Sequence, residues 1–157
     1  MVSILFVCLG NICRSPAAQG MLLHLAKNRT PPMDISVESC GLGDWHQGQL
    51  PDERMQKAAK YRGLTLASRA RGFRPEFFDN FDYILCADNK VLFELHRFAK
   101  IPEHKEKIHL ITSFSTVFKD QEVPDPYYGG EGHFDLVLDM LEESCQSLLD
   151  HLSEEKK

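Results

Sequence analysis

The 157-residue sequence lacks any apolar run that approaches the roughly 20 residues of a membrane-spanning helix. Its hydrophobic start, residues 1–9, has neither a basic beginning nor a small-residue cleavage site, which argues against a signal peptide. Positive charge is not in excess, because 18 Lys and Arg face 23 Asp and Glu, for a net charge of −5. We therefore expect neither a membrane nor a nucleic-acid partner, although a local cluster of donors can still bind an anionic substrate.

A disulfide framework is also missing, since the five cysteines are odd in number and irregularly spaced. This usage is typical of a reducing compartment and predicts a cytoplasmic protein. The seven histidines show no metal-ligand spacing, so we expect them to be surface or core residues and not metal ligands. We expect no cofactor. No internal repeat, low-complexity linker or domain boundary interrupts the chain, which predicts a single domain over residues 1–157.

Short apolar segments of high β-propensity alternate with segments of helical period. We predict strands over 3–8, 34–41, 81–88 and 107–112, and helices over 17–28, 51–63, 89–100 and 133–152. The charged tail, 153–157, is expected to fray. The alternation predicts an α/β fold with a parallel sheet flanked by helices on both faces. The last helix carries one apolar stripe: Phe134, Leu138, Leu141, Cys145, Leu148 and Leu152.

The first predicted strand ends at Cys8, and the segment CLGNICRSP leads from it into the first predicted helix. Gly10 permits a tight turn and Asn11 tolerates a left-handed backbone, so successive amides can point inward toward an anion. Arg14 would add a planar fork that binds two phosphate oxygens, and the Ser15 hydroxyl would donate to the sulfur. The carboxyl end of a parallel strand is where α/β sheets bind ligands.

These neighbours would favour the thiolate of Cys8 and place it beneath a bound phosphate, ready for in-line attack. The alternative for Cys8 alone is a buried structural cysteine, with Arg14 an ordinary solvated helix residue. The combination of residue types at a strand-to-helix turn favours the nucleophile.

The segment CLGNICRSP matches the C-x5-R-S signature of the low-molecular-weight protein tyrosine phosphatases, and the whole chain resembles that family. The segments ESCG, DW, FDYILCAD and VPDPYYGG are similar to family segments in the expected order. The resemblance implies a four-stranded parallel sheet in a Rossmann-like three-layer fold, a cysteinyl-phosphate intermediate and no metal. It also implies a phosphate-binding loop of Leu9, Gly10, Asn11, Ile12, Cys13, Arg14 and Ser15.

The resemblance further implies that Asp125, in VPDPYYGG, is the general acid and then the base. The residues alone would favour a turn aspartate at that position. Family members line the slot above the phosphate with aromatic side chains, which correspond here to Trp45, Tyr127 and Tyr128. The alternative is that these three rings simply pack against or cap the sheet. A deep aromatic slot would let phosphotyrosine reach the thiol while phosphoserine falls short.

Ser39 is expected, from the same resemblance, to bond to Asn11 and support the loop. The chain departs from many relatives by carrying Arg69 where they have a histidine, so no loop-supporting histidine is assigned. Relatives with a second cysteine at the position of Cys13 can form a reversible disulfide with the nucleophile under peroxide. The other interpretation of Cys13 is a small apolar loop residue. Three further cysteines are expected to be structural: Cys40, Cys86 and Cys145.

We predict a phosphotyrosyl protein or peptide as the substrate, and inhibition by phosphate, vanadate and similar oxyanions. Three alternatives remain on the same scaffold. An arsenate reductase would need a partner cysteine after Cys86, and none follows in 89–100. An arginine phosphatase tends to carry threonine at the position of Ile12 and a D-P-F segment. A non-catalytic phosphopeptide-binding module would be expected only if the nucleophile or the acid were missing.

Overall fold

Four parallel strands form the central sheet of the computed structural model, which describes residues 1–127 and 129–155. Their order across the sheet is β2-β1-β3-β4. The chain winds outward from β1 to β2, returns across β1 to β3, and continues outward to β4. The direction of winding switches at β1, so the space beyond its carboxyl end is the expected ligand position. The strands are β1 (Val2–Cys8), β2 (Ile35–Gly41), β3 (Tyr83–Cys86) and β4 (Ile108–Leu110).

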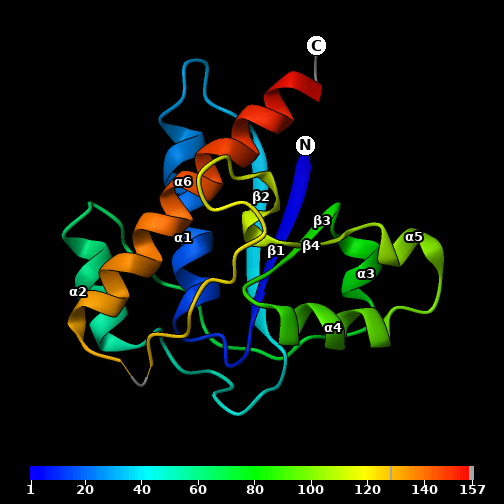
Figure 1. Ribbon diagram of the computed structural model, residues 1–157, viewed down its shortest axis with the longest axis horizontal. Coiled ribbons are helices and arrows are strands. Elements are labelled where there is room, and N and C mark those ends of the chain that lie inside the picture. The colour runs from blue at the N-terminus through cyan, green and yellow to red at the C-terminus, as the bar shows by residue number, and fades with distance from the viewer. Residues whose placement is uncertain (128, 156–157) are drawn as a thin grey trace.

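Helices cover both faces of the sheet, which confirms the predicted three-layer α/β arrangement (Figure 1). One layer holds α1 (Arg14–Lys27), α2 (Glu53–Lys60) and α6 (Glu131–Glu155). The other holds α3 (Phe77–Asn80), α4 (Asn89–Phe98) and α5 (Pro102–Lys105). A 3-10 turn, η1 (Ile111–Phe114), follows β4 directly.

The central strand β1 is apolar throughout because it is buried on both faces. Ile4 and Phe6 point into the core shared with α1 and α6, whereas Leu5 and Val7 point into the core beneath α3 and α4. All four are fully buried. This burial fixes the register of β1 and hence the position of Cys8 at its carboxyl end.

Two kinds of boundary differ from the sequence prediction. The last helix was predicted to end at residue 152, but α6 continues to Glu155, into the tail that was expected to fray; residues 156–157 lie outside the described part of the chain. The Glu155 carboxylate accepts a hydrogen bond from the Tyr83 hydroxyl at 3.0 Å and pairs with His151 at 3.0 Å, which holds the last turn. Strand β3 ends earlier than expected, at Cys86, because Asp88 already caps α4.

The predicted stripe of α6 is confirmed, since its six apolar side chains from Phe134 to Leu152 are all buried. The short helices α3 and α5 and the turn η1 were not predicted, because four-residue elements carry too little periodicity to detect. Within the described ranges, no helix combines the length and apolarity needed to span a bilayer.

Candidate active site

The loop between β1 and α1 curls around the sulfur of Cys8. Asn11 adopts a left-handed backbone with φ of 59°, and its amide N–H lies 3.3 Å from Cys8 Sγ. The loop then turns directly into α1, whose first residue is Arg14, so the unpaired amides of the helix start border the same space. Cys8 itself is 2% exposed. The arrangement has the form of an anion-binding nest built around a thiol.

Gly41, at the end of β2, lets the loop pack tightly against the sheet. A Cβ at this position would lie 2.8 Å from the Gly43 carbonyl oxygen and 3.0 Å from that of Leu9. The backbone beyond it pairs with the loop, because Leu42 N donates to the Cys8 carbonyl at 2.8 Å. Only glycine fits this close approach, which fixes the loop from one side.

Buried hydrogen bonds hold the inside of the loop. Ser15 Oγ lies 3.0 Å from Cys8 Sγ, and Asn11 Nδ2 donates to Ser15 Oγ at 2.7 Å and to Ser39 Oγ at 3.0 Å. Asn11 Oδ1 in turn accepts from the backbone N–H of Arg71 at 3.0 Å. Asn11, Ser15 and Ser39 are all buried, so these bonds are shielded from water.

Arg14 is buried beside the sulfur rather than solvated. It is 2% exposed, and its Nη1 donates to Asp88 Oδ2 at 2.7 Å and to the Val123 carbonyl at 3.0 Å. Burial by itself lowers the pKa of Arg14, but Cys8, Asp88 and Asp125 together raise the pKa above its ordinary value. The guanidinium is therefore a permanent cation at the base of the site.

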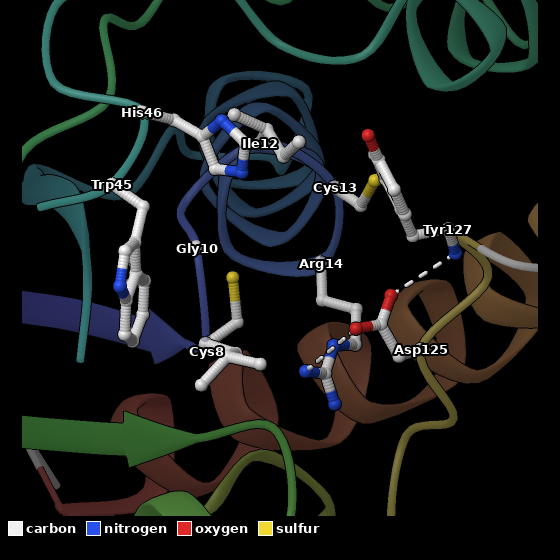
Figure 2. Close-up of a pocket in the computed structure, with 10 residues that line it drawn as sticks. Cys8, Gly10, Ile12, Cys13, Arg14, Trp45, His46, Asp125 and Tyr127 are labelled. Atoms are coloured by element: carbon white, nitrogen blue, oxygen red, sulfur yellow. Dashed lines mark hydrogen bonds and ion pairs between the residues drawn. The ribbon is translucent and has the colours of Figure 1, made fainter. Parts of the chain in front are cut away.

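A cavity of about 270 Å³ opens above Cys8 and Arg14. Asp125 lies on its rim, with Oδ2 3.6 Å from Arg14 Nη2 and Oδ1 accepting from the Tyr127 N–H at 3.0 Å (Figure 2). The Asp125 side chain is 36% exposed, so it faces both solvent and the cavity. A thiol, a fixed cation and a carboxyl group thus share one space of the size of a small ligand.

The sequence model of a family described as "Low molecular weight phosphotyrosine protein phosphatase" matches residues 3–157. The chain belongs to this family. A low molecular weight phosphotyrosine protein phosphatase of Homo sapiens is 36% identical, over 94% of each chain. Solved structures of phosphatases share the fold. A protein tyrosine phosphatase from Entamoeba histolytica has a TM-score of 0.94, 41% identity and full coverage of both chains. A Drosophila arginine phosphatase has a TM-score of 0.87 and 36% identity, covering 95% of this chain and 96% of its own.

In this phosphatase-family chain, three aromatic side chains were predicted to line the slot above the phosphate. The structure describes two of them, and both line the cavity. Trp45 is 65% exposed, and its ring lies over Gly43, where a Cβ would come within 2.6 Å of the ring. Tyr127 stands across the opening from it (Figure 2). Tyr128, the third, lies outside the described residues.

The remaining residues singled out in the sequence are four cysteines and Arg69. Cys13 lines the cavity and is buried, and this burial, followed by the nearby Asp52, Cys8 and Asp125, raises the pKa of its thiol far above the ordinary value. Arg69 Nη1 donates to the Gly48 carbonyl at 3.1 Å. Burial also raises the pKa of the remaining three thiols, which are free and lie in the core: Cys40, Cys86 and Cys145.

Three residues of the site were not predicted from the sequence. Asp88 holds Arg14, Arg71 donates its amide to Asn11, and the His46 ring packs on Gly10 at the cavity wall. Asp88 had a detectable signal, because it ends the predicted strand 81–88, and α/β sheets bind ligands at the carboxyl ends of their strands. The other two lie in irregular segments with no pattern that marks them. Among the described residues, no cluster of three or more His, Cys, Asp or Glu side chains is arranged to hold a metal ion.

Proposed function

We propose that this chain hydrolyses phosphotyrosyl proteins or peptides through a cysteinyl-phosphate intermediate. The observation that carries the proposal is the enclosure of the Cys8 sulfur by the Asn11 amide and the Ser15 hydroxyl, with Arg14 and Asp125 on the same cavity. The Asn11 amide donates to the sulfur, and the Ser15 hydroxyl lies within hydrogen-bond distance of it, so both groups hold the sulfur at the base of the cavity. The membership of the chain in the phosphotyrosine phosphatase family supports the same chemistry.

In the first step the phosphate of the substrate occupies the nest above Cys8. The Nη1 group of Arg14 is engaged by Asp88 and Val123, so the Nε–Nη2 edge serves two phosphate oxygens. The Cys8 thiolate attacks phosphorus and the bond to the tyrosyl oxygen breaks. A protonated Asp125 transfers its proton to that oxygen, which leaves as the neutral phenol.

In the second step a water molecule attacks the phosphorus of the cysteinyl phosphate. Asp125, now a carboxylate, accepts a proton from this water, and the Cys8 thiolate leaves. The Ser15 hydroxyl at 3.0 Å stabilises the departing sulfur by donating to it. Inorganic phosphate is the product, so phosphate, vanadate and similar oxyanions should occupy the same nest and inhibit.

The walls of the cavity favour a flat aromatic substrate. Trp45 and Tyr127 stand on opposite sides of the opening, so a flat ring that enters the cavity would lie between two aromatic side chains (Figure 2). A second candidate is a protein arginine phosphatase, because a relative at 36% identity is named as one. Ile12 at the cavity wall and the tyrosine at position 127 favour phosphotyrosine.

The test is phosphate release from matched phosphotyrosyl, phosphoarginyl and phosphoseryl peptides, with wild type and Cys8→Ser side by side. We expect turnover of phosphotyrosine alone, abolished in Cys8→Ser, while phosphate still binds the variant. A preference for phosphoarginine would keep the nucleophile and reject the substrate class. Turnover that survives Cys8→Ser would reject the mechanism.

Cys13 is proposed as a redox partner of Cys8 in a cytoplasmic protein. Peroxide would oxidise the Cys8 thiolate to a sulfenic acid, which condenses with the Cys13 thiol to a disulfide and water. The raised pKa of Cys13 means that it acts as a protonated thiol, which slows this condensation. We expect Cys13→Ser to retain turnover but to recover poorly after peroxide and reductant. Full recovery of that variant would refute the redox role.

A further inference from the structure

Arg54, in the first turn of α2, reaches across to the segment that carries Asp125. Its Nη2 donates to the Tyr127 carbonyl at 2.9 Å, and its guanidinium lies 5.4 Å from the Tyr127 ring centroid and 4.9 Å from that of Phe134. We propose that Arg54 is a positioning residue, which fixes the 124–127 segment so that Asp125 can deliver its proton. The proposal rests on the proposed function, because it concerns the acid of that reaction.

Asp52 fixes Arg54 from the other side. The Asp52 carboxylate accepts from Arg54 Nε at 3.1 Å and from Nη2 at 2.9 Å, and it also caps α2 by accepting from the Arg54 backbone N–H at 2.8 Å. The side chain of Asp52 is only 10% exposed. Burial raises the pKa of the Asp52 carboxyl, but the hydrogen bonds from Arg54 lower it by more. The net pKa of Asp52 therefore lies below its ordinary value. The pair is therefore ionised at neutral pH and fixed in its fork geometry.

The same residues connect the acid to the phosphate-binding loop. The Asp52 backbone N–H donates to the Ile12 carbonyl at 2.8 Å, inside that loop. From Ile12 the connection runs through Asp52 and Arg54 to the carbonyl of Tyr127. The amide of Tyr127 then donates to Asp125 Oδ1 at 3.0 Å, which leaves Oδ2 on the side of Arg14. One chain of hydrogen bonds thus sets the distance between the bound phosphate and the acid.

The role is separable from folding. The Arg54 side chain is 45% exposed, and ion pairs at such positions contribute little to stability. Loss of Arg54 should therefore disturb the placement of Asp125 more than the fold. An error of about 1 Å in the position of a catalytic group is enough to slow its step severely.

The experiment compares kcat/KM for phenyl phosphate, whose leaving group needs a proton, with kcat/KM for p-nitrophenyl phosphate, whose leaving group needs one far less. In Arg54→Gln we expect the first value to fall about tenfold and the second by less than about threefold, in keeping with partial loss of general-acid catalysis. Arg54→Lys keeps a donor for the Tyr127 carbonyl without the fork and should recover part of the loss. Arg62→Gln is the matched control, since Arg62 follows α2 and also donates to a backbone carbonyl, that of Asp135 at 3.2 Å.

Equal losses on both substrates in Arg54→Gln, or the same change of ratio in Arg62→Gln, would overturn the proposal. A second measurement needs no turnover: hydrogen exchange of the Tyr127 amide. We expect it to be about tenfold faster in Arg54→Gln than in wild type or Arg62→Gln, as local opening becomes easier. Unchanged exchange would also overturn the proposal. Absence of Cys8-dependent turnover in the wild type would instead reject the proposed function, and the exchange result would still decide the role of Arg54.

Discussion

Replacing Asp88 by asparagine tests how the phosphate-binding arginine is held. The two carboxylate oxygens of Asp88 accept from different donors: Oδ1 from the Val91 N–H at 2.9 Å, and Oδ2 from Arg14 Nη1 at 2.7 Å. Asparagine has the same shape but only one accepting oxygen. Whichever way its amide turns, an NH₂ group faces one of these two N–H donors.

The expected magnitude follows from what is lost. If the amide faces Arg14, a charge-assisted hydrogen bond worth about 1.5–3 kcal/mol disappears from a guanidinium that is 2% exposed. If it faces Val91, the helix cap is lost, at about 1 kcal/mol. We expect the free energy of unfolding to fall by about 1–3 kcal/mol. Since about 1.4 kcal/mol is tenfold in rate, a similar loss at the transition state lowers kcat/KM about tenfold to hundredfold.

The assay is urea unfolding together with phosphotyrosyl-peptide turnover and inhibition by phosphate. Asp82→Asn is the matched control, because Asp82 accepts from the Ser3 N–H at 2.8 Å at the start of the sheet, away from the site. It should keep normal kcat/KM and most of its stability, because only Oδ2 of Asp82 accepts from Ser3 and the amide oxygen of asparagine can replace it. Tighter phosphate inhibition with unchanged kcat/KM in Asp88→Asn would refute the reasoning, since it would mean that Asp88 competes with phosphate for Arg14 instead of orienting it.

Three further predictions follow from the geometry. Asp125→Ala should slow substrates with poor leaving groups at least tenfold more than p-nitrophenyl phosphate, measured as kcat/KM across an aryl phosphate series; an equal loss across the series removes Asp125 as the acid. Asn11→Ala should lower the free energy of unfolding by about 2–4 kcal/mol in urea, because it strands buried partners and puts alanine at φ of 59°. Burial raises the pKa of Glu143, but hydrogen bonds, first that from Ser115, lower it by more, so that the net pKa lies below its ordinary value. Its stabilisation is therefore complete above the unfolded pKa and lost as pH falls through the folded one, so Glu143→Gln should flatten stability against pH below about 5.

The local part of the site could be predicted from the sequence because its causes are local. A short, continuous apolar strand ending at Cys8, followed by Gly10 and a helix start, fixes where the thiol and Arg14 stand. The apolar stripe of the last helix was likewise visible as a period. Asp125 and Trp45 depended on the family resemblance, since their segments carry no period that ties them to the loop.

The supports contributed by distant segments could not be predicted in the same way. The amide of Arg71 reaches Asn11 only because 71–73 runs beside the end of β2, where Gly72 forms a bridge with Gly41. That approach depends on the path of an irregular segment, which leaves no periodic mark. The helical end of α6 was missed for a similar reason, because Glu155 is held by Tyr83, 72 residues away.

The two edges of the Arg14 guanidinium have different roles: one anchors the side chain in the fold, and the other faces the phosphate. Nη1 joins the loop after β3, through Asp88, to the segment before the acid, through the Val123 carbonyl. Nη2 faces the cavity and Asp125 at 3.6 Å. A phosphate that binds the free edge therefore reaches a group already tied to the backbone two residues before Asp125. A lysine at position 14 has a single ammonium, which could bond to Asp88 and Val123 or to the phosphate, but not to both in fixed geometry. The position of the bound phosphate would then no longer be fixed relative to Asp125.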